Sequence, residues 1–334
     1  MSIASVLIIL SYTTSMQNST LIKLAKTADV RGYERLNWLY EPLVFIYAVV
    51  SLLVVSAVLA LPVVFYVMAT EGVENAIEIV ESPPTPGLAF AILFSSFIGI
   101  YFAVWLWLYL IERRPFTTIG LQAKQAVWRY VRGLLIGVGF ICLVVGILAL
   151  FGWVDWERTF AGFSASLLSG VGLLFAGFVI QGAAEEVLVR GFLLPIFARR
   201  YNLWVSIVVT SLIFAVLHLL NPNLSPIAVL NLFLAGIIFA LYALKEGSIW
   251  GACGLHTTWN WTMGHVFGFE VSGGSFGGPG SILFDLMETG PDWMTGGLFG
   301  LEGGVIVTLV LILGSIAIYL SPTNTADEAS PNVA

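Results

Sequence analysis

Charged residues are scarce in this sequence. Asp, Glu, Lys and Arg make up 10% of the 334 residues, while hydrophobic residues make up 58%. Soluble globular domains usually carry about 25% charged residues, so the composition excludes that class. The formal net charge is −6 and no basic cluster is present, which argues against nucleic acid as a partner.

Cysteines and nucleotide motifs are also sparse. The two cysteines, Cys142 and Cys253, lie in apolar segments and cannot form a disulfide framework or a C-x-x-C metal site. No P-loop, G-x-G-x-x-G or G-x-S-x-G pattern occurs, so no nucleotide partner and no serine-hydrolase chemistry is expected. Residues 1–16 are apolar without a basic leading region, which argues against a cleaved signal peptide and leaves a partial span open.

Long uncharged runs take the place of these features. Stretches of about 18 or more apolar residues are typical of bilayer-spanning helices. We therefore predict an all-α, polytopic integral membrane helix bundle with a buried polar site. About eight transmembrane helices are expected, near residues 42–69, 87–111, 132–153, 162–198, 203–220, 226–244, 248–267 and 301–320.

The basic residues predict the orientation of these helices. Twelve of the fourteen Lys and Arg residues fall on one side of the predicted spans. By the positive-inside rule this side is cytoplasmic, which places both termini in the cytoplasm and the protein in the cell membrane. We divide the chain into a cytoplasmic N-terminal segment (1–41), N-terminal helices with a basic connector (42–158) and a transmembrane core (159–267). A Gly-rich external loop (268–300) and a last helix with a polar tail (301–334) follow.

Ionisable and amide side chains interrupt three of the predicted spans. Such groups are costly inside a membrane and usually functional. Spacings of four residues place two pairs of these side chains on common helix faces. At a rise of about 1.5 Å per residue, all three helices bring their polar residues to a similar depth. The three groups are Glu185, Glu186 and Arg190 on the fourth span, His218 on the fifth, and His256 and Asn260 on the seventh.

Together these side chains are suited to hydrolysis of a peptide bond by activated water. A carboxylate and an imidazole that converge on one water form a general-base pair. A second imidazole with an amide supplies hydrogen bonds to an oxyanion. Alternatively, Glu185, His218 and His256 could be three ligands of a divalent metal such as zinc, with an open fourth position. The spacing departs from H-E-x-x-H, so a metal is permitted without being indicated.

These residues resemble the CAAX-protease and bacteriocin-processing family of intramembrane proteases, also called the Abi or type II CAAX prenyl endopeptidase family. Its pattern is E-E-x-x-x-R, F-x-x-x-H and H-x-x-x-N on successive membrane helices. All three motifs are present here in that order, within residues 162–267. They are Glu185-Glu186 with Arg190, Phe214 with His218, and His256 with Asn260.

The resemblance implies an intramembrane endopeptidase that acts on a membrane-associated protein or peptide. It implies that Glu185 and His218 activate the water and that His256 and Asn260 bind the oxyanion. Glu186 and Arg190 would support the site, and the ion pair between them is also explained by a purely structural role. The family is described as metalloproteases, although metal participation is disputed, and the Gly-rich loop argues against a prenylated substrate.

Two other functions remain open at this level. One is a non-catalytic bacteriocin self-immunity or membrane interaction protein that keeps the fold. The other is a proton-coupled transporter that uses the carboxylates and histidines as a relay. The absence of an internal repeat disfavours the transporter.

Overall fold

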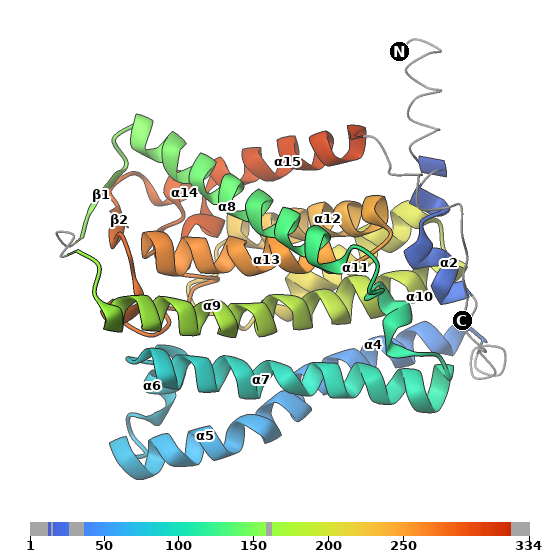
Figure 1. The fold of residues 1–334 in the computed structure, drawn as a ribbon, viewed down its shortest axis with the longest axis horizontal. Helices are drawn as coiled ribbons and strands as arrows, with labels where there is room; N and C mark the ends of the chain where they lie inside the picture. Colours follow the sequence, from blue (N-terminus) through green and yellow to red (C-terminus); the bar gives the residue numbers. More distant parts are fainter. Residues whose placement is uncertain (1–12, 15, 27–36, 158–161, 322–334) are drawn as a thin grey trace.

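The computed structural model describes residues 13–14, 16–26, 37–157 and 162–321. Long helices run side by side along one axis of the molecule (Figure 1), which confirms the prediction of a helical, polytopic membrane bundle. The questions of a partial span at residues 1–16 and of a polar tail after Leu320 fall mostly outside the described residues. The helices of the first half are α2 (Thr20–Lys26), α4 (Tyr40–Val50), α5 (Ser56–Glu71), α6 (Ala76–Glu81), α7 (Pro86–Trp107) and α8 (Ala126–Leu150).

The second half of the chain continues the bundle and adds a small sheet. Its helices are α9 (Ala165–Glu186), α10 (Leu194–Arg200), α11 (Leu203–Leu217), α12 (Pro226–Glu246), α13 (Trp250–Trp261), α14 (Asp292–Thr295) and α15 (Val305–Leu320). Strands β1 (Val154–Trp156) and β2 (Leu286–Glu288) pair antiparallel. The sequence did not predict these strands, since each is only three residues long and β2 lies inside the Gly-rich loop.

Five helices are long and apolar enough to cross a membrane: 40–71, 86–112, 126–150, 165–200 and 226–246. Helices α11 and α15 are apolar but shorter. The predicted span 248–267 corresponds to α13 and a following π-helical segment, Thr262–Phe267, and it is not among the candidate spans. This segment contains too many polar side chains to meet a hydropathy criterion for a span. These side chains are tolerated because α13 is surrounded by protein rather than by lipid.

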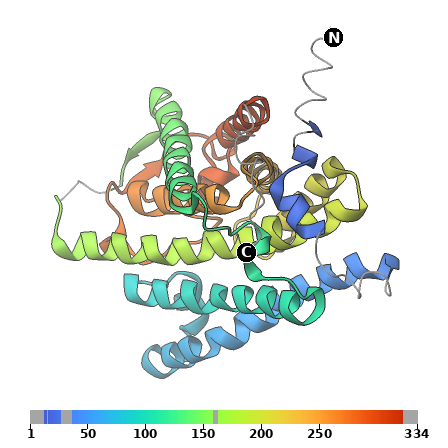
Figure 2. The same cartoon turned by 45° about the vertical axis from the view of Figure 1, so that its right-hand side comes forward.

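Helix α9 separates two layers of the molecule, as the turned view shows (Figure 2). Helices α4, α5 and α7 form a layer on one side of it, and α8, α13 and α15 lie on the other. The arm formed by α4, the π-helical segment Ser51–Val55 and α5 is apolar and largely exposed, as expected of a surface in contact with lipid. The predicted polar site residues lie on or directly after three helices: α9, α11 and α13.

Glycines let α8 and α13 approach closely. A Cβ atom at Gly137 would lie 2.5 Å from the carbonyl oxygen of Leu255, and one at Gly133 would collide with the carbonyl oxygen of Gly251. Small residues at helix interfaces are the usual means of close packing in membranes, where no hydrophobic force joins the helices. The hydroxyl of Thr258 also donates to the carbonyl of Leu134 at 2.7 Å. These contacts fix the height of α13 and therefore of His256 and Asn260.

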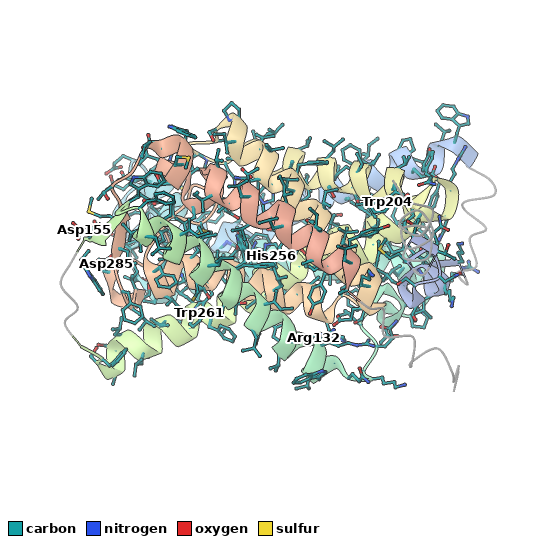
Figure 3. All side chains as sticks on the ribbon, turned by 90° about the horizontal axis from the view of Figure 1, so that it is seen from above. Arg132, Asp155, Trp204, His256, Trp261 and Asp285 are labelled. Atoms are coloured by element: carbon teal, nitrogen blue, oxygen red, sulfur yellow. The ribbon has the colours of Figure 1, made fainter. Side chains whose placement is uncertain are left out.

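The two ends of the bundle differ in chemistry. Among the described residues, the basic side chains gather at the end where α2 and α10 lie, and β1, β2 and α14 occupy the opposite end (Figure 1). Figure 3 places His256 in the middle of the bundle, with Asp155 and Asp285 near one end and Trp204 toward the other. The Gly-rich loop contains α14 and short 3-10 turns, as its composition allowed, and it packs inward through Phe299 and Leu301.

Candidate functional site

The two adjacent glutamates lie where the fourth span changes its helical form. Helix α9 ends at Glu186, and a π-helical segment, Val187–Leu193, carries the chain to α10. Such π-segments are rare and occur frequently at functional sites. Every residue of this segment is buried, so the wider turn lies inside the protein.

Glu186 and Arg190 form a buried ion pair within this region. The Arg190 Nη1 lies 2.8 Å from the Glu186 Oε1, and both side chains are almost completely inaccessible to solvent. The guanidinium also donates to the Gly236 carbonyl at 3.3 Å and lies over the rings of Phe214 and Phe239, 4.4 and 5.0 Å from their centroids. A buried charge pair is tolerated only when further partners satisfy it, and here α11 and α12 supply them. The pair therefore locks α9 to two neighbouring helices.

Glu185 faces the two histidines predicted to join it. Its Oε2 lies 3.8 Å from the Nε2 of His218 and 3.8 Å from the Nε2 of His256. This oxygen accepts no hydrogen bond from the described residues. The other oxygen, Oε1, accepts a hydrogen bond from the Gln181 amide at 2.6 Å. One carboxylate oxygen is thus held in place while the other is presented to both imidazoles.

The hydrogen bonds at the far side of each imidazole set its orientation. The Nδ1 of His218 lies 2.8 Å from the carbonyl oxygen of Phe214, which can only accept. The Nδ1 of His256 lies 3.0 Å from the Glu186 carboxylate. Both contacts favour the tautomer with the proton on Nδ1, which directs a lone pair on Nε2 toward Glu185. Ring contacts add to this, since Phe239 stacks on His256 with centroids 4.8 Å apart.

Asn260 reaches the site through a residue that the motifs do not include. Its Nδ2 donates to the Gln181 Oε1 at 2.9 Å, and Gln181 in turn donates to Glu185. Gln181 is buried one helical turn before Glu185, so the two share a face of α9. The available signal was a lone glutamine in an otherwise uncharged, apolar span, four residues before Glu185. The structure therefore brings all six predicted residues together and adds Gln181 as a bridge.

A cavity of about 330 Å³ lies beside these groups. Glu185, Gln181, His218 and Asn260 supply its polar wall, and the rest is mostly apolar. His256 lines a much smaller adjoining space of about 20 Å³. Glu186 and Arg190 line neither space, which suits residues that support the site from behind. His265, by contrast, is bonded to the Ser281 carbonyl and belongs to the packing of the loop.

The three residues that would hold a metal, if one is bound, lie close to one another: Glu185, His218 and His256. Ligand atoms bound to zinc at about 2.0–2.2 Å in a tetrahedral site lie roughly 3.4 Å apart. The carboxylate oxygen of Glu185 is 3.8 Å from each imidazole nitrogen. Among the described residues, no group of three or more His, Cys, Asp or Glu side chains is placed to hold a metal ion.

Comparison with known proteins agrees with the motifs. Residues 167–262 match the family model of type II CAAX prenyl endopeptidase Rce1-like proteins. The matched segment contains all seven motif residues, and it confirms the resemblance predicted from them. It supports a CAAX-protease-like endopeptidase at the level of the family.

Two relatives extend the similarity to bacteria. The chain is 28% identical to the uncharacterized protein YyaK of Bacillus subtilis (strain 168) over 226 residues, which cover 65% of this chain and 70% of YyaK. It is 33% identical to an uncharacterized 24.3 kDa protein of Escherichia coli over 93 residues, which cover 27% of this chain and 42% of that protein. No solved structure matches the chain.

Proposed function

We propose that this protein is an intramembrane endopeptidase that hydrolyses a peptide bond with a water molecule activated by Glu185 and His218. The observation that carries the proposal is the Glu185 Oε2, which accepts no hydrogen bond from the described residues and lies 3.8 Å from two imidazole nitrogens. A water about 2.8 Å from both acceptors fits this separation and donates one proton to each. Its remaining lone pairs are then free to attack a carbonyl carbon in the cavity.

The hydrogen bonds of each group determine which atoms accept and return protons during hydrolysis. The attacking water loses a proton to the pair of Glu185 and His218, and the same pair returns a proton to the leaving amine. His218 accepts at Nε2 because the Phe214 carbonyl holds its Nδ1 proton. No acyl-enzyme is needed, since the water itself is the nucleophile. The tetrahedral intermediate therefore collapses with no net change in the protein.

The developing oxyanion is assigned to His256 and Asn260. The Asn260 amide donates one N–H to Gln181 and keeps a second N–H for a ligand. His256, whose Nδ1 contacts the Glu186 carboxylate, donates from Nε2 to the oxyanion once it has taken up a second proton. Loss of one oxyanion donor typically costs 10²–10³-fold in rate, so both groups are testable.

The test is a comparison of protein termini in membranes of cells that express the wild type or Glu185→Gln at equal abundance. We expect new termini with the wild type that are absent with Glu185→Gln. The matched control is Glu78→Gln, which makes the same change on the exposed surface of α6 and should leave cleavage intact. Identical termini in all three samples would contradict the proposal and favour a non-catalytic immunity or interaction role.

A further inference from the structure

The loop residues in the cavity wall come from one end of the molecule. They belong to α6, to the turn after α11 and to the Gly-rich loop, and they include Val80, Asn221, Pro222, Ser272 and Phe276. All of these segments lie at the end of the bundle that carries β1, β2 and α14. No described residue from the connectors at the opposite end lines the cavity. The site is therefore reached from the side of β1 and β2.

The opposite end is closed by buried ion pairs. Glu112 is inaccessible to solvent and accepts hydrogen bonds from Tyr40 at 2.6 Å, Arg114 at 2.5 Å and Arg199 at 3.2 Å. This network joins the ends of α4, α7 and α10. On the other side of the bundle, Arg132 pairs with Glu246 at 2.5 Å. These contacts tie the helix ends together on this side of the molecule.

The two ends carry opposite charge. Ten of the described basic residues lie at the end of the bundle where α2 and α10 lie. The described part of the cavity end has no basic residue. It carries acidic side chains, among them Glu71, Glu78, Asp155, Glu288 and Asp292. Basic loops remain in the cytoplasm during membrane insertion. The cavity end is thus assigned to the extracytoplasmic half of the membrane.

At the same end of the molecule, burial and the nearby Glu270 raise the pKa of Glu288 to about 7.

The lining also specifies the chemistry of the occupant. Glu185 is the one charged side chain on the cavity wall, and no Lys or Arg of the described chain contributes to it. A free carboxylate in this cavity would find no Lys or Arg side chain to pair with, and an unpaired buried charge is costly. Leu52 of the π-helical segment Ser51–Val55 and two residues of α7, Leu93 and Phe97, instead provide an apolar wall.

The turn after α11 points to access through the bilayer. Helix α11 has fifteen residues and is about 22 Å long, which is shorter than the roughly 30 Å hydrocarbon layer. Its end at Leu217 therefore lies within that layer when its beginning is at the cytoplasmic surface. Leu219 and Leu220, in the turn that follows, are 50% and 85% exposed and would contact lipid next to the cavity residue Asn221.

We infer that the cavity admits an uncharged, apolar stretch of polypeptide from the extracytoplasmic half of the membrane, and that it does not recognise a chain terminus with a free carboxylate. The inference rests on the proposed function only in treating the occupant as a substrate. The side of access and the charge selectivity are properties of the cavity itself. Both can be measured without cleavage.

Cysteine accessibility tests the side of access. In a background with Cys142→Ala and Cys253→Ala, we would introduce Val80→Cys and Asn221→Cys in the cavity wall, Glu74→Cys on the exposed α5–α6 connection and Thr117→Cys at the basic end. A small, membrane-impermeant, charged methanethiosulfonate reagent should modify the two cavity cysteines and Glu74→Cys in intact cells. Thr117→Cys should react only in inverted vesicles. Cavity cysteines that react from the Thr117 side, or from neither side, would overturn the inference.

Peptide protection tests the charge selectivity. A hexapeptide of Leu, Val and Ala, acetylated and amidated, should slow modification of Asn221→Cys in a Glu185→Gln background, where no cleavage is expected. The same peptide with a free C-terminal carboxylate should protect about tenfold less well, because the carboxylate must be buried without a partner. Equal or better protection by the free acid would overturn this part. Neither result depends on catalysis, so the proposed function can fail while this inference stands, and the reverse also holds.

Discussion

Helices α5 and α13 invert the rule that apolar residues are buried. Helix α5 is uncharged until its last residue, and only Ser56 and Val67 of its sixteen residues are buried. Helix α13 carries a histidine, an asparagine and two threonines, and ten of its twelve residues are buried. Lipid is as apolar as leucine, so burial of apolar surface does not hold these helices together. In this pair the apolar helix α5 faces outward, while the more polar helix α13 lies in the interior and carries His256 and Asn260.

The largest effect is expected where the polar interior is broken. Arg190→Met should lower the free energy of unfolding by about 3–5 kcal/mol, because Glu186 is then left as an uncompensated buried charge. Phe65→Ala, which truncates an exposed residue of α5, should change it by no more than about 0.5 kcal/mol. Equilibrium unfolding in mixed detergent measures both. Similar losses for the two variants would contradict the comparison.

A second effect concerns the close packing that positions α13. Gly137→Ala should cost about 1–3 kcal/mol and reduce cleavage, since its Cβ would press on the backbone of α13. Gly139→Ala, two residues further along the same helix, meets no atom within 4 Å and should be neutral or slightly stabilising. Unfolding of the two variants under identical conditions gives the answer. An equally stable Gly137→Ala would show that α8 does not fix the height of α13.

A smaller effect is expected at the bridging amide. Gln181→Leu keeps the volume near Glu185 but removes the hydrogen bond to Oε1 and leaves Asn260 without its acceptor. A lost buried hydrogen bond of this kind costs about 1–3 kcal/mol, which corresponds to a fall in rate of about tenfold or somewhat more. If Gln181 is a positioning residue, kcat should fall more than KM changes. An unaltered pH profile and rate would assign it to packing alone.

The smallest effect is expected at Glu288 in the Gly-rich loop, whose pKa is raised from 4.5 to about 7. Between these two values the folded protein keeps a proton that the unfolded chain releases. The stability of the β1–β2 pair should therefore fall as the pH rises from 4.5 to 7 and level off above. Hydrogen exchange of the strand amides measures this. Glu288→Gln should abolish the dependence, whereas a pH profile unchanged by that substitution would assign it to another group.

The comparison also explains what the sequence could predict. The apolar runs identified the long helices, including the exposed arm at 40–71 and the mostly buried α12, because hydropathy reports length and composition rather than location. The depth and spacing of Glu185, His218 and His256 indicated a shared site, because costly groups in a membrane are placed where they have partners. Helix α13 was included as a span, although its composition does not meet a length and hydropathy criterion.

Other features depend on tertiary contacts and could not be predicted. Gln181 bridges α9 and α13, and a lone glutamine does not indicate which neighbour it contacts. Glu302 ties the Gly-rich loop to α13 by accepting hydrogen bonds from Trp259 at 3.0 Å and from the Ser272 amide at 2.9 Å, and it lies outside every motif. The spacing of the motif does not reveal the π-helical segment after Glu186. Glu186 and Arg190 are four residues apart, which is also the spacing of an ion pair on an ordinary α-helix.

The proposed hydrolysis depends on activation of a water molecule at Glu185. The most direct measurement is the cleavage rate of a substrate identified by its new termini, with purified wild type, Glu185→Gln and Glu78→Gln whose unfolding is measured in parallel. We predict a loss of at least about 10²–10⁴-fold for Glu185→Gln with unfolding close to wild type, and full activity for Glu78→Gln. A folded Glu185→Gln protein that cleaves at the wild-type rate would contradict the account.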